Sequence, residues 1–160
     1  MFTSSLSFNQ DIGRWDVSKV TNMIQMFQRA TSFNQYIGDW NVSSVENMLA
    51  MFNKADSFNQ DIGGWDVSNV ISMRAMFTDA SSFNQDISSW DVSKVTTMSF
   101  MFENAVSFDQ DLRGWDVTGI VFTDGKFGQG FKGMFDGATA MLARYPQLST
   151  EQGIIDWFNS

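Results

Sequence analysis

A repeat of 25 residues dominates the sequence and constrains its fold more than any other feature. The tetrapeptide Ser-Phe-Asn-Gln recurs at this interval, in its last copy as Ser-Phe-Asp-Gln, and a Trp follows each copy at a constant distance: Trp15, Trp40, Trp65, Trp90 and Trp115. One unit of this length cannot bury its own apolar side chains, so such repeats stack, and each contacts its neighbours. We therefore expect a stack of similar coils.

The second half of the unit FNQDIGRWDVSKVTNMIQMFQRATS, residues 8–32, has a helical spacing of apolar residues. Val20, Met23, Phe27 and Ala30 follow the pattern i, i+3, i+7, i+10, which places them on one face of a helix. Ser18 precedes this run and is a favourable N-cap residue. The pattern predicts a short helix in every coil.

The first half of the unit has the pattern of extended chain. Trp15 and Val17 flank Asp16 with the period of two that is typical of a short strand. The predicted fold class is therefore α/β: a leucine-rich-repeat-like solenoid of about five 25-residue coils, each with a short parallel strand and a short helix, closed by a C-terminal cap. Met1 and Phe2 match the end of a repeat, so we expect residues 1–120 to start in mid-repeat.

Residues 121–160 depart from the repeat and are expected to form the cap. The segment GKFGQGFKG, residues 125–133, is predicted to contain an irregular glycine-rich insertion that displaces the repeat by eight residues, after which MFDGATAM resumes the ending of a last partial repeat. Ser149 to Gln152 fit a capping box. They predict a final short helix whose Ile154, Ile155 and Phe158 are available for burial.

The string FNQDIxxWDVSxVxxMxxMFxxAxS resembles the BspA-like leucine-rich-repeat surface proteins, in the 25-residue form of mycoplasma lipoproteins. The resemblance covers residues 1 to about 120. It implies display at the cell surface or outside the cell, adhesion and protein–protein contact. It implies no catalytic residues.

Composition narrows the classes of function. The chain has neither His nor Cys, so it lacks the commonest general base and all thiolate chemistry. The net charge of −8 argues against nucleic acid as a partner. No stretch is long and apolar enough for a membrane span. We expect no cofactor, no metal and no enzymatic activity.

Two columns of acidic residues recur at the repeat interval. Asp16, with its equivalents Asn41, Asp66, Asp91 and Asp116, could bind Ca²⁺ or a cationic partner. The interpretation we favour is that each Asp accepts hydrogen bonds from the turn that follows it. Asp11 heads the second column, which Tyr36 interrupts. The column that begins at Asn9 is predicted to bond the backbone of the adjacent coil.

The function that the sequence favours is a non-enzymatic protein-interaction module of the surface or adhesion type. The alternative is a linker or scaffold subunit of a larger assembly, docked through an open N-terminal coil. That coil is expected to meet a protein partner, a longer parent chain or a second copy in a homodimer. The residues predicted to contact a partner are Phe2, Leu6, Phe8, Ile12, Arg14, Tyr36 and Asp39.

Overall fold

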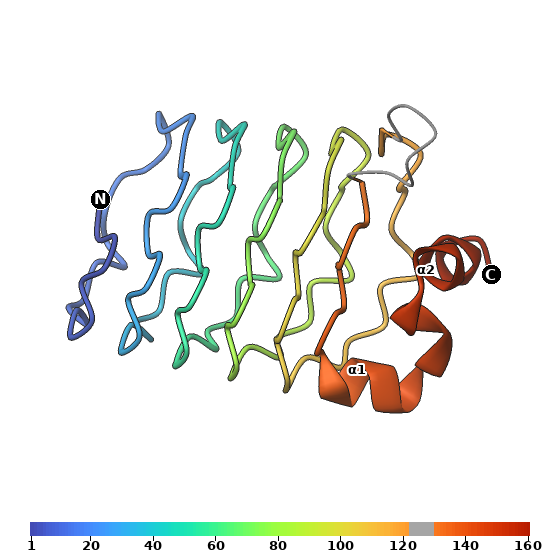
Figure 1. The fold of residues 1–160 in the computed structure, drawn as a ribbon. Coiled ribbons are helices and arrows are strands. Elements are labelled where there is room, and N and C mark those ends of the chain that lie inside the picture. The colour runs from blue at the N-terminus through green and yellow to red at the C-terminus, as the bar shows by residue number, and fades with distance from the viewer. Residues whose placement is uncertain (122–129) are drawn as a thin grey trace.

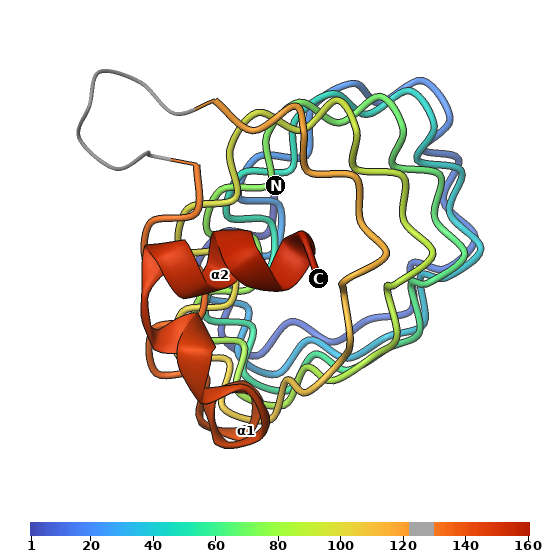
Figure 2. The ribbon, with the colours of Figure 1, turned by 90° about the vertical axis from the view of Figure 1, so that its right-hand side faces the viewer.

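The computed structural model describes residues 1–121 and 130–160, which form a row of stacked coils closed by helices at the C-terminal end (Figure 1). Each coil is one repeat of the sequence: residues 8–32, 33–57, 58–82 and 83–107, with a last coil that begins at residue 108. Viewed along the row, the coils superpose around a common interior (Figure 2). Equivalent residues of successive repeats therefore lie in columns that run along the stack.

Backbone hydrogen bonds alternate between two directions within each coil. In the first repeat, the amides of Met23, Gln25 and Phe27 donate to carbonyls 24 residues ahead, in the next coil. The amides of Met26 and Gln28 instead close turns, because they donate to the carbonyls of Met23 and Gln25. The same alternation recurs in the later repeats. Stacking and turn formation thus share the backbone donors of this segment.

This alternation requires a positive φ, a backbone conformation that residues other than glycine usually avoid. Gln25 and Arg29 have φ of 54° and 59°, and their equivalents in later coils also have positive φ. A positive φ at the third position is a feature of a type II turn, where glycine is the usual residue. In the last coil, glycine does occupy both columns, as Gly133 and Gly137.

The predicted α/β solenoid of short strands and short helices is wrong. Within the described residues, helices occur only after residue 138, and the parallel pairings are isolated bridges: Asn22 with Asn47, Asn47 with Ser72, and Ser72 with Thr97. The Phe27 and Phe52 rings, in successive coils, are 5.6 Å apart. Packed helices need about 8–10 Å between their axes. Helices therefore do not fit at this spacing, although the apolar stripe that predicted them is buried from Met23 to Ala30.

The predicted strand at Trp15–Val17 is also absent because it lies between two turns. The Trp15 amide donates to the carbonyl of Ile12, and the Val20 amide donates to that of Val17. Trp15 to Val17 form no bridge to a neighbouring coil in the described part of the chain. The period of two at Trp15 and Val17 therefore comes from a short segment between two turns and not from a strand.

Two columns of Phe rings and one column of Trp run through the core, together with buried columns of Ile, Val, Met and Ala. Phe27 stacks on Phe33, six residues on in the chain, at 4.0 Å and on its equivalent Phe52, one repeat on, and the pattern repeats along the stack. Trp65 is 4% exposed, and its Nε1 donates to the Ile37 carbonyl of the preceding coil. Trp40, Trp90 and Trp115 are buried to the same degree, whereas Trp15 of the first repeat is 42% exposed.

The C-terminal segment consists of α1 (Thr139–Arg144), the 3₁₀ helix η1 (Pro146–Ser149) and α2 (Glu151–Phe158). Before them, the Phe102 amide donates to the Met134 carbonyl, 32 residues ahead in place of 24, so the register has shifted by the eight residues expected from the sequence. Residues 125–129 of the predicted insertion lie outside the described residues.

Helix α2 lies across the end of the stack (Figures 1 and 2). Its Phe158 stacks on Phe131 at 5.3 Å, and its Trp157 meets Phe135 edge to face. Thr150 is the N-cap, one residue after the predicted Ser149, and its Oγ1 accepts a hydrogen bond from the Gly153 amide. The apolar end of the last coil is covered in this way.

Candidate functional site

Three of the sequence-predicted contact residues gather in one hollow of about 330 Å³. Arg14 comes from the first repeat, whereas Tyr36 and Asp39 come from the second. The other lining residues are Asp11, Gly13 and Gln35, which the sequence reasoning did not include among contact residues. The sequence did indicate both polar residues: Asp11 occupies the position equivalent to Tyr36 in the preceding repeat, and Gln35 directly precedes Tyr36.

Tyr36 is the central side chain of this hollow, here called the Tyr36 hollow. Its side chain is exposed, and its hydroxyl donates to Asp39 Oδ1 at 3.0 Å. The hydrogen bond to Asp39 raises the pKa of Tyr36, and burial and the charges of Asp39 and Asp61 raise it further. The phenol is therefore a neutral donor that holds one end of the ring in place.

Glycine at position 38 allows the ring to lie close to the backbone. A Cβ at Gly38 would lie 2.8 Å from Tyr36 Cε2 and Oη and 2.6 Å from the Asp61 carbonyl oxygen. A side chain at position 38 would force the Tyr36 ring or the Asp61 backbone to shift. Gly38 and Asp39 together therefore fix the orientation of Tyr36.

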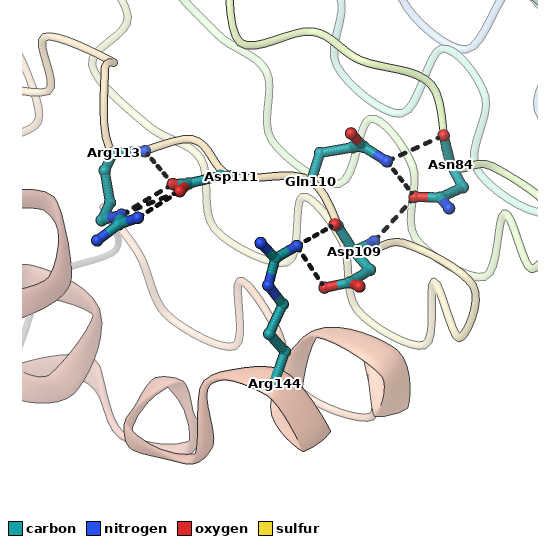
Figure 3. A network of polar contacts seen from close by, with 6 residues as sticks. All are labelled: Asn84, Asp109, Gln110, Asp111, Arg113 and Arg144. Carbon is teal, nitrogen blue, oxygen red and sulfur yellow. Dashed lines mark hydrogen bonds and ion pairs between the residues drawn. The ribbon is translucent and has the colours of Figure 1, made fainter.

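Arg14 and Arg113 are both cationic, but they differ in their partners. Arg113, near the C-terminal end, forms a two-pronged pair with Asp111 and lowers the pKa of that carboxyl to about 2 (Figure 3). Arg14 is exposed and forms no ion pair with any residue that the structure describes. The guanidinium of Arg14 is therefore available to a partner.

The Asp16 column forms the turns that the sequence analysis favoured. Asp16 Oδ1 accepts hydrogen bonds from the Ser18 amide at 3.0 Å and the Ser18 hydroxyl at 2.6 Å. These bonds lower the pKa of Asp16, and equivalent bonds lower that of Asp66, Asp91 and Asp116. Asn41 makes the same two bonds without a charge. This column is therefore part of the backbone architecture, although the helix expected after each turn is absent.

The predicted asparagine column is confirmed as a link between coils. Asn34 Oδ1 accepts hydrogen bonds from the Asn59 amide at 3.0 Å and from Gln60 Nε2 at 2.9 Å, and the same arrangement recurs along the column. Asp109 ends the column and contacts Arg144 of α1 through its carbonyl and carboxylate (Figure 3). Sequence reasoning missed Arg144, although the change from Asn to Asp at position 109 was a signal for a cationic partner.

The remaining predicted contact residues do not line the Tyr36 hollow. Phe2 and Phe8 are half-buried and stack on each other with ring centroids 3.8 Å apart. Leu6 is 57% exposed, whereas Ile12 is buried in the core at 3%. The predicted set therefore separates into Arg14, Tyr36 and Asp39 in the hollow and four apolar residues nearer the N-terminus.

Two further features concern only the described residues. No group of three or more acidic side chains among residues 1–121 and 130–160 is placed to hold a metal ion. None of the helices in the same ranges has both the length and the apolar character needed to cross a membrane.

A family model for a mycoplasma protein of unknown function matches residues 1–57 and 37–141. No curated protein and no solved structure matches the chain. The match supports a mycoplasma-type repeat family, but it does not extend to the leucine-rich-repeat surface proteins that the sequence resembles. The two matched ranges together cover most of the sequence, so the chain belongs to the family described as Mycoplasma protein of unknown function, DUF285.

Proposed function

We propose that this repeat protein is a non-enzymatic module that binds another protein through the Tyr36 hollow. The observation that carries the proposal is the exposed Tyr36 ring, held by Asp39 beside Arg14, whose guanidinium has no ion-pair partner among the described residues. Tyr and Arg are enriched among the residues that contribute most to protein interfaces. A ring whose orientation is already fixed also loses little conformational freedom on binding.

The environment of the carboxylates supports a binding function over catalysis. An acid–base site needs two carboxylates in different environments, so that their pKa values separate. Asp66 and Asp91 instead accept the same pair of hydrogen bonds, and their pKa values are lowered for the same reason. We infer that these side chains serve the turns and leave no distinctive acid or base in this column.

The test is selection of binders from a random peptide display library with the wild-type chain as bait. Tyr36→Asp introduces the residue that Asp61 and Asp86 supply in the same column, so the fold should tolerate it. The matched control is Ile71→Thr, because Ile71 is 48% exposed and Thr96 occupies the next position of its column.

We expect selected peptides to lose at least about tenfold in affinity with Tyr36→Asp and to keep their affinity with Ile71→Thr. That loss corresponds to about 1.4 kcal/mol of binding free energy, which is typical of an interface residue that contributes substantially to affinity. Peptides that are equally sensitive to both variants, or to neither, would overturn the proposal.

A further inference from the structure

We propose that the Tyr36 hollow receives a single Lys or Arg side chain from an extended peptide of the partner. This inference rests on the proposed function and adds the chemistry of the ligand. The ring of Tyr36, the carboxylates around it and the position of Arg14 support it.

The Tyr36 ring offers a surface for a cation. The side chain is 50% exposed, and the bond from its hydroxyl to Asp39 leaves a carboxylate at the edge of the ring. A cation over the face of an aromatic ring is attracted by the ring's electrons. A cation on Tyr36 would therefore meet the ring and the Asp39 carboxylate together.

The carboxylates near the ring strengthen this preference for a cation. Asp11 and Asp39 line the hollow, and the charge of Asp61 acts on the Tyr36 phenol. In both Asp11 and Asp61, Oδ1 accepts a hydrogen bond from the amide two residues on. The turns thus use one oxygen of each of these two carboxylates. Neither Asp11 nor Asp61 forms an ion pair within the described part of the chain, so both keep their negative charge. A cationic ligand therefore finds negative charge on more than one side.

Arg14 limits the number of cations that the hollow accepts. It lies in the same hollow and repels every incoming positive charge, so the total repulsion grows with each basic residue that a ligand carries. It also offers a partner for an acidic residue next to the bound Lys or Arg. The hollow is therefore matched to one basic side chain with neutral or acidic neighbours, and not to a polybasic segment.

The experiment uses nuclear magnetic resonance titration of the 160-residue chain with three nine-residue Gly/Ser peptides. The first has one central Arg, the second one central Glu, and the third three consecutive Arg residues. The amide signals of Gly13 and Gly38 report binding, because both glycines lie beside Tyr36. Thermal unfolding of each variant checks that the fold is intact.

Tyr36→Asp separates ring recognition from simple charge attraction. It removes the ring but adds a negative charge, so charge attraction alone would strengthen binding of the Arg peptide. We expect binding to weaken about two- to fivefold, the range of a cation–aromatic contact at an exposed site. Tyr36→Phe keeps the ring and should retain most of the affinity. Asp39→Asn should weaken binding by a similar factor to Tyr36→Asp.

Equal or stronger binding of the Arg peptide by Tyr36→Asp would overturn the inference, as would equal binding of the Glu peptide. A clear preference for the peptide with three Arg residues would show a general acidic surface and would also overturn it. The library selection separates this result from the proposed function. Selected peptides that depend on Tyr36 but lack Lys and Arg would uphold protein binding and refute the basic ligand.

Discussion

The coils and the C-terminal helix α2 satisfy their backbone hydrogen bonds in different ways. In the coils, the amide of Phe27 donates to Met51, whereas at the start of α2 the amide of Ile154 donates to Thr150, four residues back. A coil therefore depends on its neighbour, while α2 carries its own hydrogen bonds. Repetition therefore permits a backbone conformation that an isolated segment would not hold.

The largest expected effect is loss of a core ring in the middle of the stack. Trp65→Ala removes a buried indole and its hydrogen bond to Ile37, and should lower the free energy of unfolding by about 3–5 kcal/mol. Chemical denaturation followed by circular dichroism measures the loss. Trp15→Ala is the control, because Trp15 is 42% exposed, and its loss should be less than half as large. Equal losses would contradict the assignment of the core.

The next effect compares a link between coils with the link to the C-terminal segment. Asn59→Ala removes the acceptor of the Asn84 amide and of the Gln85 side-chain amide, and the loss of two ordinary hydrogen bonds should cost about 1–2 kcal/mol. Arg144→Ala removes an exposed ion pair with Asp109 and should cost less than about 1 kcal/mol. Denaturation curves for the two variants test the order. A larger cost for Arg144→Ala would show that the C-terminal segment, and not the asparagine column, limits stability.

A third prediction uses glycine to distinguish the two backbones. At position 29, with φ of 59°, Gly should be more stable than Ala by up to about 1 kcal/mol, because Ala is strained in that conformation. At Gln152, in the exposed face of α2, Gly should be less stable than Ala by about 1 kcal/mol. The reversal of sign is measured as the difference in unfolding free energy between the Gly and Ala variants at each position. The same sign at both positions would contradict the turn conformation of the coil.

The same contrast explains what could be predicted from the sequence. The end of the chain follows local rules, so the final helix was expected within one or two residues of its observed start at Glu151. The buried stripe from Met23 to Ala30 was also identified, because burial depends on side chains alone. The backbone conformation of that stripe was not predicted, because Gln25 and Arg29 are residues that readily form helices. Only the close spacing of the coils excludes a helix there. Gly133 and Gly137, in the same columns, were a local sign of positive φ.

The candidate site was predicted in part for the same reason. Tyr36 was singled out because it breaks a column of Asp, and Arg14 and Asp39 because their column varies from repeat to repeat. The stacking of the first two repeats placed Arg14 beside the other two, and added Asp11 and Gln35. The hydrogen bond from Tyr36 to Asp39 depends on the turn at Gly38, which no spacing in the sequence specifies.

The smallest expected effect concerns Asp66, and it appears only in acid. Asp66 Oδ1 accepts two hydrogen bonds from Ser68, which lower its pKa below the ordinary value of 3.8. A lowered pKa in the folded state adds stability that is present above pH about 4 and is lost as the pH falls through the folded value. Asn41 makes the same bonds without titrating, so Asp66→Asn should change the unfolding free energy by less than about 0.5 kcal/mol at pH 7.

Below pH about 4 the two proteins should diverge, because protonation of Asp66 weakens its bonds from Ser68, whereas an amide at this position keeps its acceptor oxygen. Urea denaturation at several pH values between about 7 and 2 measures this as a shallower acid slope for Asp66→Asn. Asp56→Asn is the control, because Asp56 is exposed and lies outside the turn column, and its carboxylate makes no hydrogen bond or ion pair with the residues that the structure describes. Parallel acid slopes for the wild type and Asp66→Asn would show that the turn bonds do not favour the ionised carboxylate, and the column would then lose its assigned role.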